Sequence, residues 1–189
     1  MVLNVPVILT LLRIVLLPVI VIVFYLDHQW ARPASCIIFL LAGLTDWADG
    51  YLARRLGQES RFGAFLDPVA DKLMVATVLL LIVGYDHSLW LTIPAIIVIG
   101  REITISALRE WMAEMGQRGK VAVSYLGKVK TTMQIVALAL LLWHHDILGL
   151  PTYKIGLAAL YVATILTIWS MVSYIQAAFA SDHLPPKNQ

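Results

Sequence analysis

The chain alternates between long apolar stretches and short polar connections. Apolar residues dominate segments of about twenty positions, and polar triplets such as Asp27-His28-Gln29 and Asp86-His87-Ser88 separate them. Segments of this length are typical of helices that cross a membrane, because a hydrocarbon core of about 30 Å needs about 20 helical residues. The pattern predicts six helices, at about residues 5–26, 33–55, 67–85, 89–114, 127–144 and 153–179.

Composition supports this interpretation. Of the 189 residues, 60% are apolar and 14% are charged, which leaves too little polar surface for a soluble domain of this size. We therefore expect an all-α integral membrane protein with one six-helix membrane domain at residues 1–182 and a short polar tail at 183–189. The net charge of +2 is too small to indicate nucleic-acid binding. Cys36, the single cysteine, lies in an apolar run and is expected to be a buried thiol without a chemical role.

The distribution of basic residues predicts the orientation of the chain. Six spans place both termini on one side of the membrane, and the segments expected on that side are rich in Lys and Arg. Only Arg32 and Lys154 fall on the other side. The positive-inside rule makes the first side, with both termini, cytoplasmic. The residues on the cytoplasmic side are Arg54, Arg55, Arg61, Arg109, Arg118, Lys120, Lys128 and Lys130.

Four carboxylates stand out because ionisable residues at membrane depth are costly and usually functional. Asp46 and Asp49 are three residues apart, and Asp67 and Asp71 are four apart, so each pair lies on one helical face. A short polar turn between the pairs should bring the two faces together. Asp67-Pro68 also has the pattern of an N-cap followed by proline, which predicts that the third helix begins there.

Four converging carboxylates repel one another, and a hard divalent cation or protonation relieves that repulsion. Oxygen ligands without nearby Cys or His favour Mg²⁺ or Mn²⁺ over zinc. His144-His145-Asp146 is interpreted as a solvated loop and not as a metal site. The alternative for the four acids is that they cap helices and pair with basic neighbours, namely Arg54, Arg55, Arg61 and Lys72.

Small residues punctuate the same segment. Gly50, Ala53 and Gly63 permit close packing of membrane helices, and they equally permit a nucleotide diphosphate to approach the backbone. In the second case, Arg54 would neutralise the charge of the diphosphate. The physical argument leaves both possibilities open.

The segment reads Asp46-Trp-Ala-Asp49-Gly50-Tyr-Leu-Ala53-Arg54, then eight residues, then Gly63-Ala-Phe-Leu-Asp67-Pro-Val-Ala-Asp71. It resembles the complete signature of the CDP-alcohol phosphatidyltransferases, D-x-x-D-G-x-x-A-R-x8-G-x-x-x-D-x-x-x-D. Chain length, the six-helix layout, the Gly-Arg-Glu-Ile run from Gly100 and the segment from Leu126 to Thr131 extend the resemblance over nearly the whole chain.

The resemblance implies transfer of a phosphatidyl group from CDP-diacylglycerol to an alcohol, with release of CMP. It implies that Asp46, Asp49 and Asp67 hold one or two Mg²⁺ or Mn²⁺ ions, and that Asp71 lies near a metal and acts as the general base. Lys72, beside that base in the sequence, is interpreted as a structural or electrostatic neighbour and not as a second base. The positions that match the CDP site are Gly50, Ala53, Arg54 and Gly63.

The N-terminal segment departs from the family pattern. Many relatives read Pro-Asn-x-Leu-Thr-x-x-Arg where this chain has Pro6-Val7-Ile8-Leu9-Thr10-Leu11-Leu12-Arg13. Valine at position 7 removes one expected polar contact to the nucleotide. Asn4, Thr10 and Arg13 remain candidates for that contact.

The resemblance also implies an acceptor, glycerol 3-phosphate, whose own phosphate needs a second basic subsite. Arg109, Lys128, Lys130 and Arg101 are the candidates, although all four can also be membrane anchors, and Arg101 can pair with Glu102 or Glu110. Other acceptors remain possible for the same chemistry, namely inositol phosphate, serine or phosphatidylglycerol. A cation-coupled transporter is the alternative from another class.

Family members are commonly homodimers. We therefore expect a dimer in the bacterial inner membrane, in contact with membrane lipids, with the site facing the cytoplasm.

Overall fold

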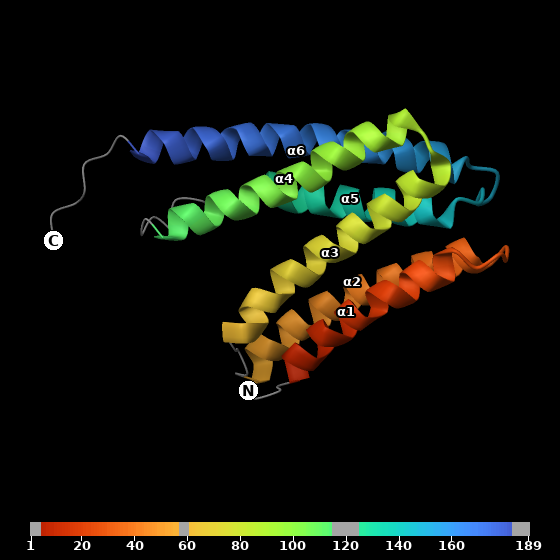
Figure 1. Cartoon of the computed structure of the whole chain (residues 1–189), viewed down its shortest axis with the longest axis horizontal. Coiled ribbons are helices and arrows are strands. Elements are labelled where there is room, and N and C mark those ends of the chain that lie inside the picture. Colours follow the sequence, from red (N-terminus) through yellow and green to blue (C-terminus); the bar gives the residue numbers. More distant parts are fainter. Residues whose placement is uncertain (1–4, 57–60, 115–124, 183–189) are drawn as a thin grey trace, which may run out of the picture.

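The structure is a computed structural model that describes residues 5–56, 61–114 and 125–182. Within these ranges, the side chains of residues 5, 6, 47–56, 61, 125–128, 174 and 177–182 are not described. The described residues form the helices α1 (Val5–Phe24), α2 (Ala31–Leu56), α3 (Arg61–Asp86), α4 (Leu89–Glu114), α5 (Tyr125–Trp143) and α6 (Thr152–Asp182) (Figure 1). The predicted all-α class is confirmed for these residues. Apart from the start of α3, the helix ends lie within three residues of the predicted ones.

The helices form two groups, α1–α3 and α4–α6 (Figure 1). Helix α1 packs on α2 and α3, α5 packs on α6 and α2, and α4 contacts α3 and α6. The two groups lie close together at the end where α1 connects to α2 and α5 connects to α6, and they separate toward the other end. Helix α1 begins and α6 ends at that other end, as an even number of helices requires.

The apolar core lies between the helices and draws on all of them. Ile20 of α1, Ile82 of α3, Leu138 of α5 and Leu160 of α6 are completely buried in it. Cys36 is also buried, and its thiol donates to the Ala139 carbonyl oxygen at 3.2 Å. The prediction of a buried thiol is therefore confirmed.

Three helices are long and apolar enough to cross a membrane. They cover Val7–Phe24, Leu89–Glu114 and Thr152–Ser173, with mean hydropathies of 3.0, 1.7 and 2.0. Large apolar side chains such as Ile22, Leu80 and Trp169 point outward on the bundle and are more than half exposed. In a bilayer such side chains contact lipid. The chain is therefore a membrane protein, whereas the crossing of all six helices and the side of the termini stay predictions.

The start of α3 corrects one expectation. The Asp67-Pro68 pair does not begin this helix, because α3 already starts at Arg61 and Pro68 lies inside it. Gly63, Leu66 and Ala70 are buried at helical spacing, so packing against the neighbouring helices holds the earlier turns in helical form. This packing outweighs the local capping signal. The Asp67 carboxylate is consequently available for a contact with another helix.

Candidate functional site

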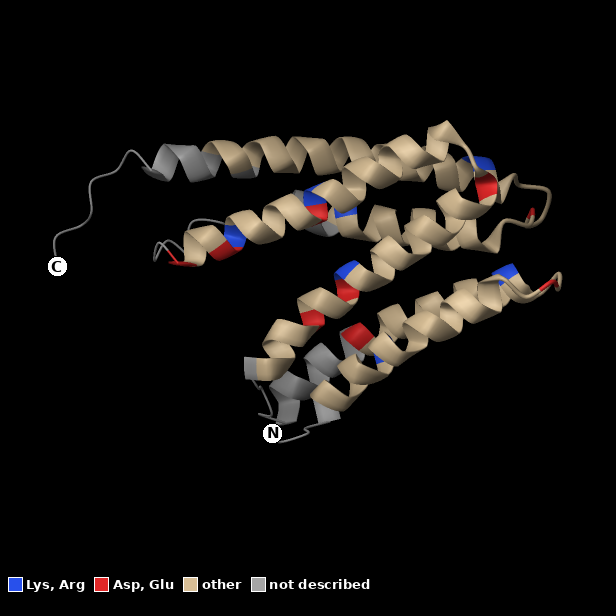
Figure 2. Cartoon of the chain, in the orientation of Figure 1, with Lys and Arg blue, Asp and Glu red and all other residues tan. Residues whose placement is uncertain are grey.

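The centre of the candidate site is Arg13, a completely buried arginine on α1. Its Nη1 atom lies 2.9 Å from Asp46 Oδ1 on α2 and 2.9 Å from Asp71 Oδ1 on α3. Because the two carboxylate oxygens contact the same nitrogen, they are at most twice that distance apart. Figure 2 shows the acidic positions of α2 and α3 converging on the basic position of α1. A buried guanidinium without such partners would be strongly destabilising.

A second contact from α1 holds the remaining described acid of the signature. Thr10 is completely buried one turn before Arg13, and its hydroxyl donates to Asp67 Oδ1 at 2.6 Å. Thr10 and Arg13 are three residues apart on α1, and Asp67 and Asp71 are four apart on α3. One face of α1 therefore contacts two successive turns of α3. We name these five residues, Thr10, Arg13, Asp46, Asp67 and Asp71, the Arg13 cluster.

The acids of the Arg13 cluster are accessible although their arginine is not. The side chains of Asp46 and Asp71 are 41% and 49% exposed, against 0% for Arg13. Both acids line a cavity of about 350 Å³ between α2, α3 and α5. The rest of its lining is mostly apolar and consists of Phe39, Leu40, Gly43, Leu44, Met74, Val75, Thr131, Gln134 and Ile135. The cavity therefore combines carboxylates with a surface suited to hydrocarbon.

The acids of this cluster fit a hard divalent cation. Their donors are carboxylate oxygens, and the position of the Arg13 nitrogen shows that one cationic group can contact acids of α2 and α3 together. Among the residues with described side chains, no group of three or more His, Cys, Asp or Glu is gathered closely enough to ligate a metal. Asp49, the fourth acid of the signature, lies outside those residues.

Several other candidates also lie outside the described part. Residue Asn4 does so completely, and only the backbone is described at Asp49, Gly50, Ala53, Arg54 and Lys128. Gly63 is described and is buried on α3. Arg109 is exposed on α4. Thr10 contacts Asp67, which gives it a role in orienting an acid of the signature.

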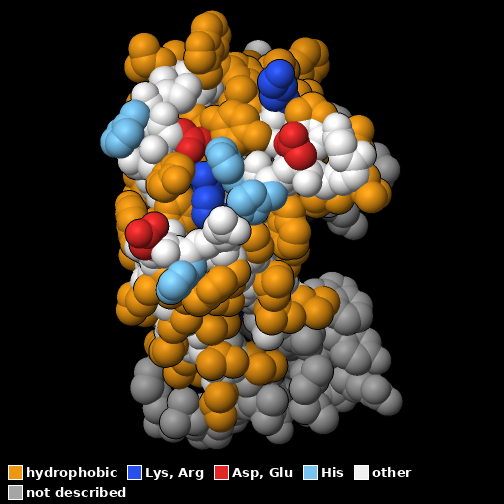
Figure 3. Space-filling model, turned by 90° about the vertical axis from the view of Figure 1, so that its right-hand side faces the viewer, with side chains coloured by type: hydrophobic (Ala, Val, Ile, Leu, Met, Phe, Trp, Pro, Cys, Tyr) orange, Lys and Arg blue, Asp and Glu red, His pale blue; other side chains and the backbone are white. Residues whose placement is uncertain are grey.

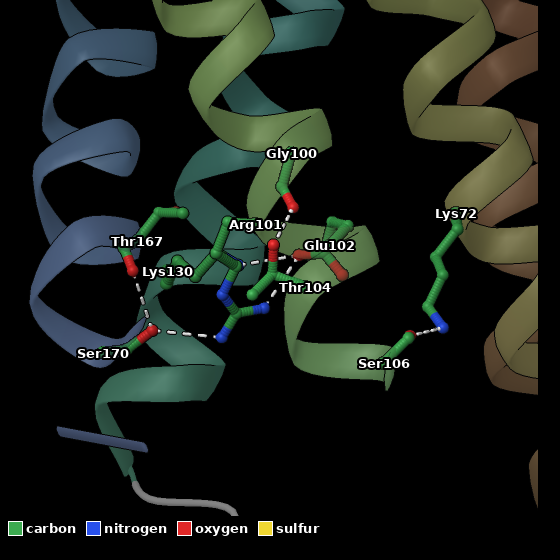
Figure 4. Close-up of polar contacts among 9 residues, drawn as sticks. All are labelled: Lys72, Gly100, Arg101, Glu102, Thr104, Ser106, Lys130, Thr167 and Ser170. Atoms are coloured by element: carbon green, nitrogen blue, oxygen red, sulfur yellow. Dashed lines mark hydrogen bonds and ion pairs between the residues drawn. The ribbon is translucent and has the colours of Figure 1, made fainter. Parts of the chain in front are cut away.

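The other two basic candidates form a buried network with an acid. Glu102 Oε1 accepts from Arg101 Nη1 at 2.9 Å and from Lys130 Nζ at 2.8 Å, which joins α4 to α5. Arg101 Nη2 also donates to Ser170 Oγ on α6 at 3.1 Å (Figure 4). Of the two expected partners of Arg101, the structure selects Glu102. We name Arg101, Glu102, Lys130 and Ser170 the Glu102 cluster.

A further polar contact lies between the two clusters. Lys72 follows Asp71 on α3, and its ammonium group donates to the Ser106 hydroxyl on α4. Ser106 lies one helical turn after Glu102, on the same face of α4 (Figure 4). Helix α3 thus contacts α1 through Asp71 and α4 through Lys72. The interpretation of Lys72 as a neighbour of Asp71 stays a prediction, because this contact joins Lys72 to α4.

Sequence reasoning missed the arginine at the centre of the site. The sequence pattern indicates Arg13 only as a nucleotide contact, although it is the one charged residue within the apolar α1. An isolated charge in such a helix is the signal of a buried partner. The pattern also indicates Glu102 only as a partner of Arg101, whereas Glu102 also binds Lys130 from another helix.

A third charged cluster lies at the end where the two helix groups meet. Arg32 of α2 is paired with Asp86 of α3 at 3.8 Å, and the side chains are 9% and 10% exposed. The Arg32 guanidinium lies over the rings of Phe24 and Tyr85, 5.3 Å and 4.5 Å from their centroids, and donates to the Leu141 carbonyl oxygen. We name Arg32, Asp86, Phe24 and Tyr85 the Arg32 cluster.

Histidines gather around a basic side chain on the outside of this end (Figure 3). Together with Arg32, His28, His144 and His145 line a cavity of about 420 Å³. Burial, and next the positive charge of Arg32, hold the pKa of His144 below its usual value. The structure shows His144 and His145 in the connection between α5 and α6, as expected of a loop, with His144 partly buried.

Comparison with known proteins identifies the relatives of this chain. The family model described as CDP-alcohol phosphatidyltransferase matches residues 3–169. A protein of Sodalis glossinidius is 57% identical over 176 residues, covering 93% of this chain and 95% of its own length. Proteins of Salmonella choleraesuis and of Shigella flexneri serotype 5b are both 55% identical, covering 93% and 94% of this chain and 94% and 96% of their own lengths. All three are named CDP-diacylglycerol–glycerol-3-phosphate 3-phosphatidyltransferase.

Proposed function

The chain belongs to the CDP-alcohol phosphatidyltransferase family, and we propose that it transfers the phosphatidyl group of CDP-diacylglycerol to the sn-1 hydroxyl of glycerol 3-phosphate. The products are phosphatidylglycerophosphate and CMP. The observation that carries the proposal is the Arg13 cluster, in which α1 contacts three acids of the family signature, and two of them, Asp46 and Asp71, line a mostly apolar cavity. The names of relatives that align over 93% or more of the chain support glycerol 3-phosphate as the acceptor.

In this reaction the hydroxyl oxygen attacks the lipid-linked phosphorus, and the bond to the bridging oxygen of the diphosphate breaks. CMP leaves with that oxygen, and the hydroxyl proton needs an acceptor. Asp71 is our candidate for this general base, because its side chain is half exposed to the cavity while Arg13 fixes its orientation. Thr10 fixes Asp67 in the same way.

The metal site proposed for this reaction uses Asp46, Asp49, Asp67 and Asp71 with one or two Mg²⁺ or Mn²⁺ ions. Members of the family generally depend on a divalent metal. A metal bound there would neutralise the negative charge of the diphosphate. The chain contributes the placement of the acids, since Arg13 and Thr10 hold three of them from α1.

The two halves of CDP-diacylglycerol need different surroundings. We assign the nucleotide to Gly50, Ala53, Arg54 and Gly63, with Asn4 at the start of the chain. The apolar wall of the cavity, including Phe39, Leu44 and Ile135, suits the acyl chains. Along α2 and α3 the acids come between the residues assigned to the nucleotide and the apolar residues of the cavity, so we assign the diphosphate to the acids.

The acceptor phosphate is assigned to the basic residues of α4 and α5. Lys130 and Arg101 are the best supported, because both are buried and share one carboxylate oxygen, which leaves a net positive charge. Arg109 and Lys128 complete the proposed subsite.

We further propose six membrane crossings, cytoplasmic termini, a homodimer and the bacterial inner membrane as the location. The site would then face the cytoplasm, where soluble glycerol 3-phosphate is present.

The test uses the purified protein in lipid nanodiscs. CDP-diacylglycerol is supplied with Mg²⁺ or Mn²⁺ and one acceptor at a time: glycerol 3-phosphate, inositol phosphate, serine or phosphatidylglycerol. We expect CMP release and phosphatidylglycerophosphate with the first acceptor, and none after chelation of the metal. CMP release with another acceptor alone would overturn the assigned substrate, and none with any acceptor would overturn the reaction.

A further inference from the structure

The Glu102 cluster carries an imbalance of charge. Arg101 and Lys130 are 9% and 3% exposed, and both bind the same oxygen of Glu102. Two cations and one anion leave a net charge of +1 within the helix bundle. Buried charge of this kind is costly unless a further anion is recruited. A phosphate group that carries two negative charges satisfies that requirement.

The two cations differ in how they are held. Arg101 is fixed from two directions, because Glu102 and Ser170 accept hydrogen bonds from different nitrogens of its guanidinium. Lys130 comes from α5, and Glu102 supplies the ion pair that ties it to α4 (Figure 4). A lysine ammonium sits on a flexible stem and has no planar geometry of its own to fix it. The position of Lys130 relative to Arg101 therefore depends on Glu102.

Two features relate the cluster to the helix segments that carry the proposed reacting groups. Thr131 directly follows Lys130 on α5, and Gln134 follows it by one turn. Both residues line the cavity beside Asp71. On α4, Ser106 lies one turn after Glu102 and binds Lys72, the residue after Asp71. The contact between Lys72 and Ser106 thus links the turn of α3 that carries the candidate base to the turn of α4 that follows Glu102.

We propose that Glu102 is a positioning residue, which holds Lys130 beside Arg101 so that the pair receives the phosphate of the acceptor alcohol. This inference rests on the proposed function. Glu102 acts through the two cations and does not itself bind the phosphate. Its negative charge also keeps the pair from repelling one another while the acceptor is absent.

The experiment compares three variants under the nanodisc assay. Glu102→Gln keeps the size of the side chain but removes its charge, Glu102→Asp keeps the charge, and Glu114→Gln removes the same charge from an exposed position of the same helix. For each variant we measure kcat, the KM of both substrates and the inhibition constant of inorganic phosphate against glycerol 3-phosphate. Thermal unfolding in detergent is followed in parallel.

We expect Glu102→Gln to raise the KM of glycerol 3-phosphate about tenfold, equivalent to about 1.4 kcal/mol, because repulsion separates Lys130 from Arg101. The inhibition constant of phosphate should rise by the same factor, while kcat and the KM of CDP-diacylglycerol change less than about twofold. Glu102→Asp should restore most of the affinity, and Glu114→Gln should match the unsubstituted protein.

Two results would overturn the inference. The first is an acceptor KM that changes less than about twofold in Glu102→Gln. The second is a joint change of kcat and both KM values with a lower unfolding temperature and no recovery in Glu102→Asp, which indicates a role in folding alone. The unsubstituted protein separates these results from failure of the proposed function, because it must first release CMP with glycerol 3-phosphate.

Discussion

The Arg13 cluster and the Arg32 cluster both pair a buried arginine with aspartate, but the surroundings of the aspartates differ. Each has an arginine that is at least nine-tenths buried and that faces aspartate from another helix. The aspartates differ, because Asp46 and Asp71 are 41% and 49% exposed to a cavity, whereas Asp86 is 10% exposed. Two aromatic rings and a backbone carbonyl also enclose Arg32.

Burial of the arginine is common to the two clusters, and the exposure of the aspartates distinguishes them. This difference is why we propose a reactive role for the Arg13 cluster and a structural role for the Arg32 cluster. In the Arg13 cluster the arginine holds carboxylates whose other surface remains open to a substrate. In the Arg32 cluster both partners are enclosed, which fastens α2 to α3 and α5. Substitutions of matched type at the two clusters should therefore separate activity from stability.

The largest effect is expected from Asp71→Asn, which keeps the shape of the side chain but removes its ability to take a proton. Turnover should fall about 1000-fold, within the range for loss of a general base, while the unfolding temperature changes little. CMP release in nanodiscs measures the rate. Asp86→Asn is the matched control, and equal losses in the two variants would contradict the distinction between the clusters.

The next effect concerns the arginine itself. Arg13→Gln leaves Asp46 and Asp71 side by side without their shared cation, so we expect turnover to fall about 100-fold and the protein to lose about 3 kcal/mol of stability. Kinetics and thermal unfolding in detergent report the two quantities. Retained activity with lowered stability would assign Arg13 a purely structural role, like the one we give to Arg32.

The enclosed pair should show the opposite pattern. Asp86→Asn removes the counter-charge of a buried guanidinium, and we expect a loss of about 3 kcal/mol, the lower end for a broken buried pair. Turnover at a temperature where the variant is folded should stay within about twofold of normal. A variant that unfolds normally but turns over slowly would place a functional site at this end.

The smallest effect is a pH dependence at the outside of the Arg32 cluster. The pKa of His144 is lowered by burial and by Arg32, so on acidification the unfolded chain takes up the proton first. The stability that His144 contributes is present above its ordinary pKa of about 6.5 and is lost as the pH falls below that value toward the lowered pKa. The other titratable groups that act on it or on Arg32 are Tyr85, Asp86, His145, Asp146 and Tyr153.

This contribution is measured by thermal unfolding at pH of about 7.5 and about 5.5, either side of the ordinary histidine pKa. We expect His144→Asn to lose less stability on acidification than the unsubstituted protein. Asparagine is chosen because His144 has a φ of 63°, which asparagine tolerates. His87→Asn is the matched control, with a φ of 47° and an exposed side chain. Equal slopes for both variants would remove His144 as the cause.

The sequence predicted the helices well because long apolar runs and polar connections determine them directly. It also placed the acids correctly along α2 and α3, since spacing alone tells which side chains share a helical face. Spacing does not tell which other helix that face meets. Residue spacing therefore could not predict the contacts of Arg13 with Asp46 and Asp71, which are 33 and 58 positions away in the sequence.

The predicted start of α3 at residue 67 was wrong for a related reason. Asp67-Pro68 is a strong local signal, but burial of Gly63 and Leu66 depends on neighbours that local sequence does not specify. The pairing of Lys130 with Glu102 likewise depends on the position of α5 along α4, which local sequence does not specify.

The arrangement around Arg13 also has a consequence for biosynthesis. Arg13 lies on α1, and its partners on α2 and α3 are synthesised after it. Until α2 is synthesised, the guanidinium of α1 has neither of these two carboxylates beside it, and until α3 follows it has only Asp46. A lone arginine is poorly accommodated in lipid. The first helix should therefore remain near the translocation machinery or the membrane surface until α1, α2 and α3 can enter the bilayer as one unit.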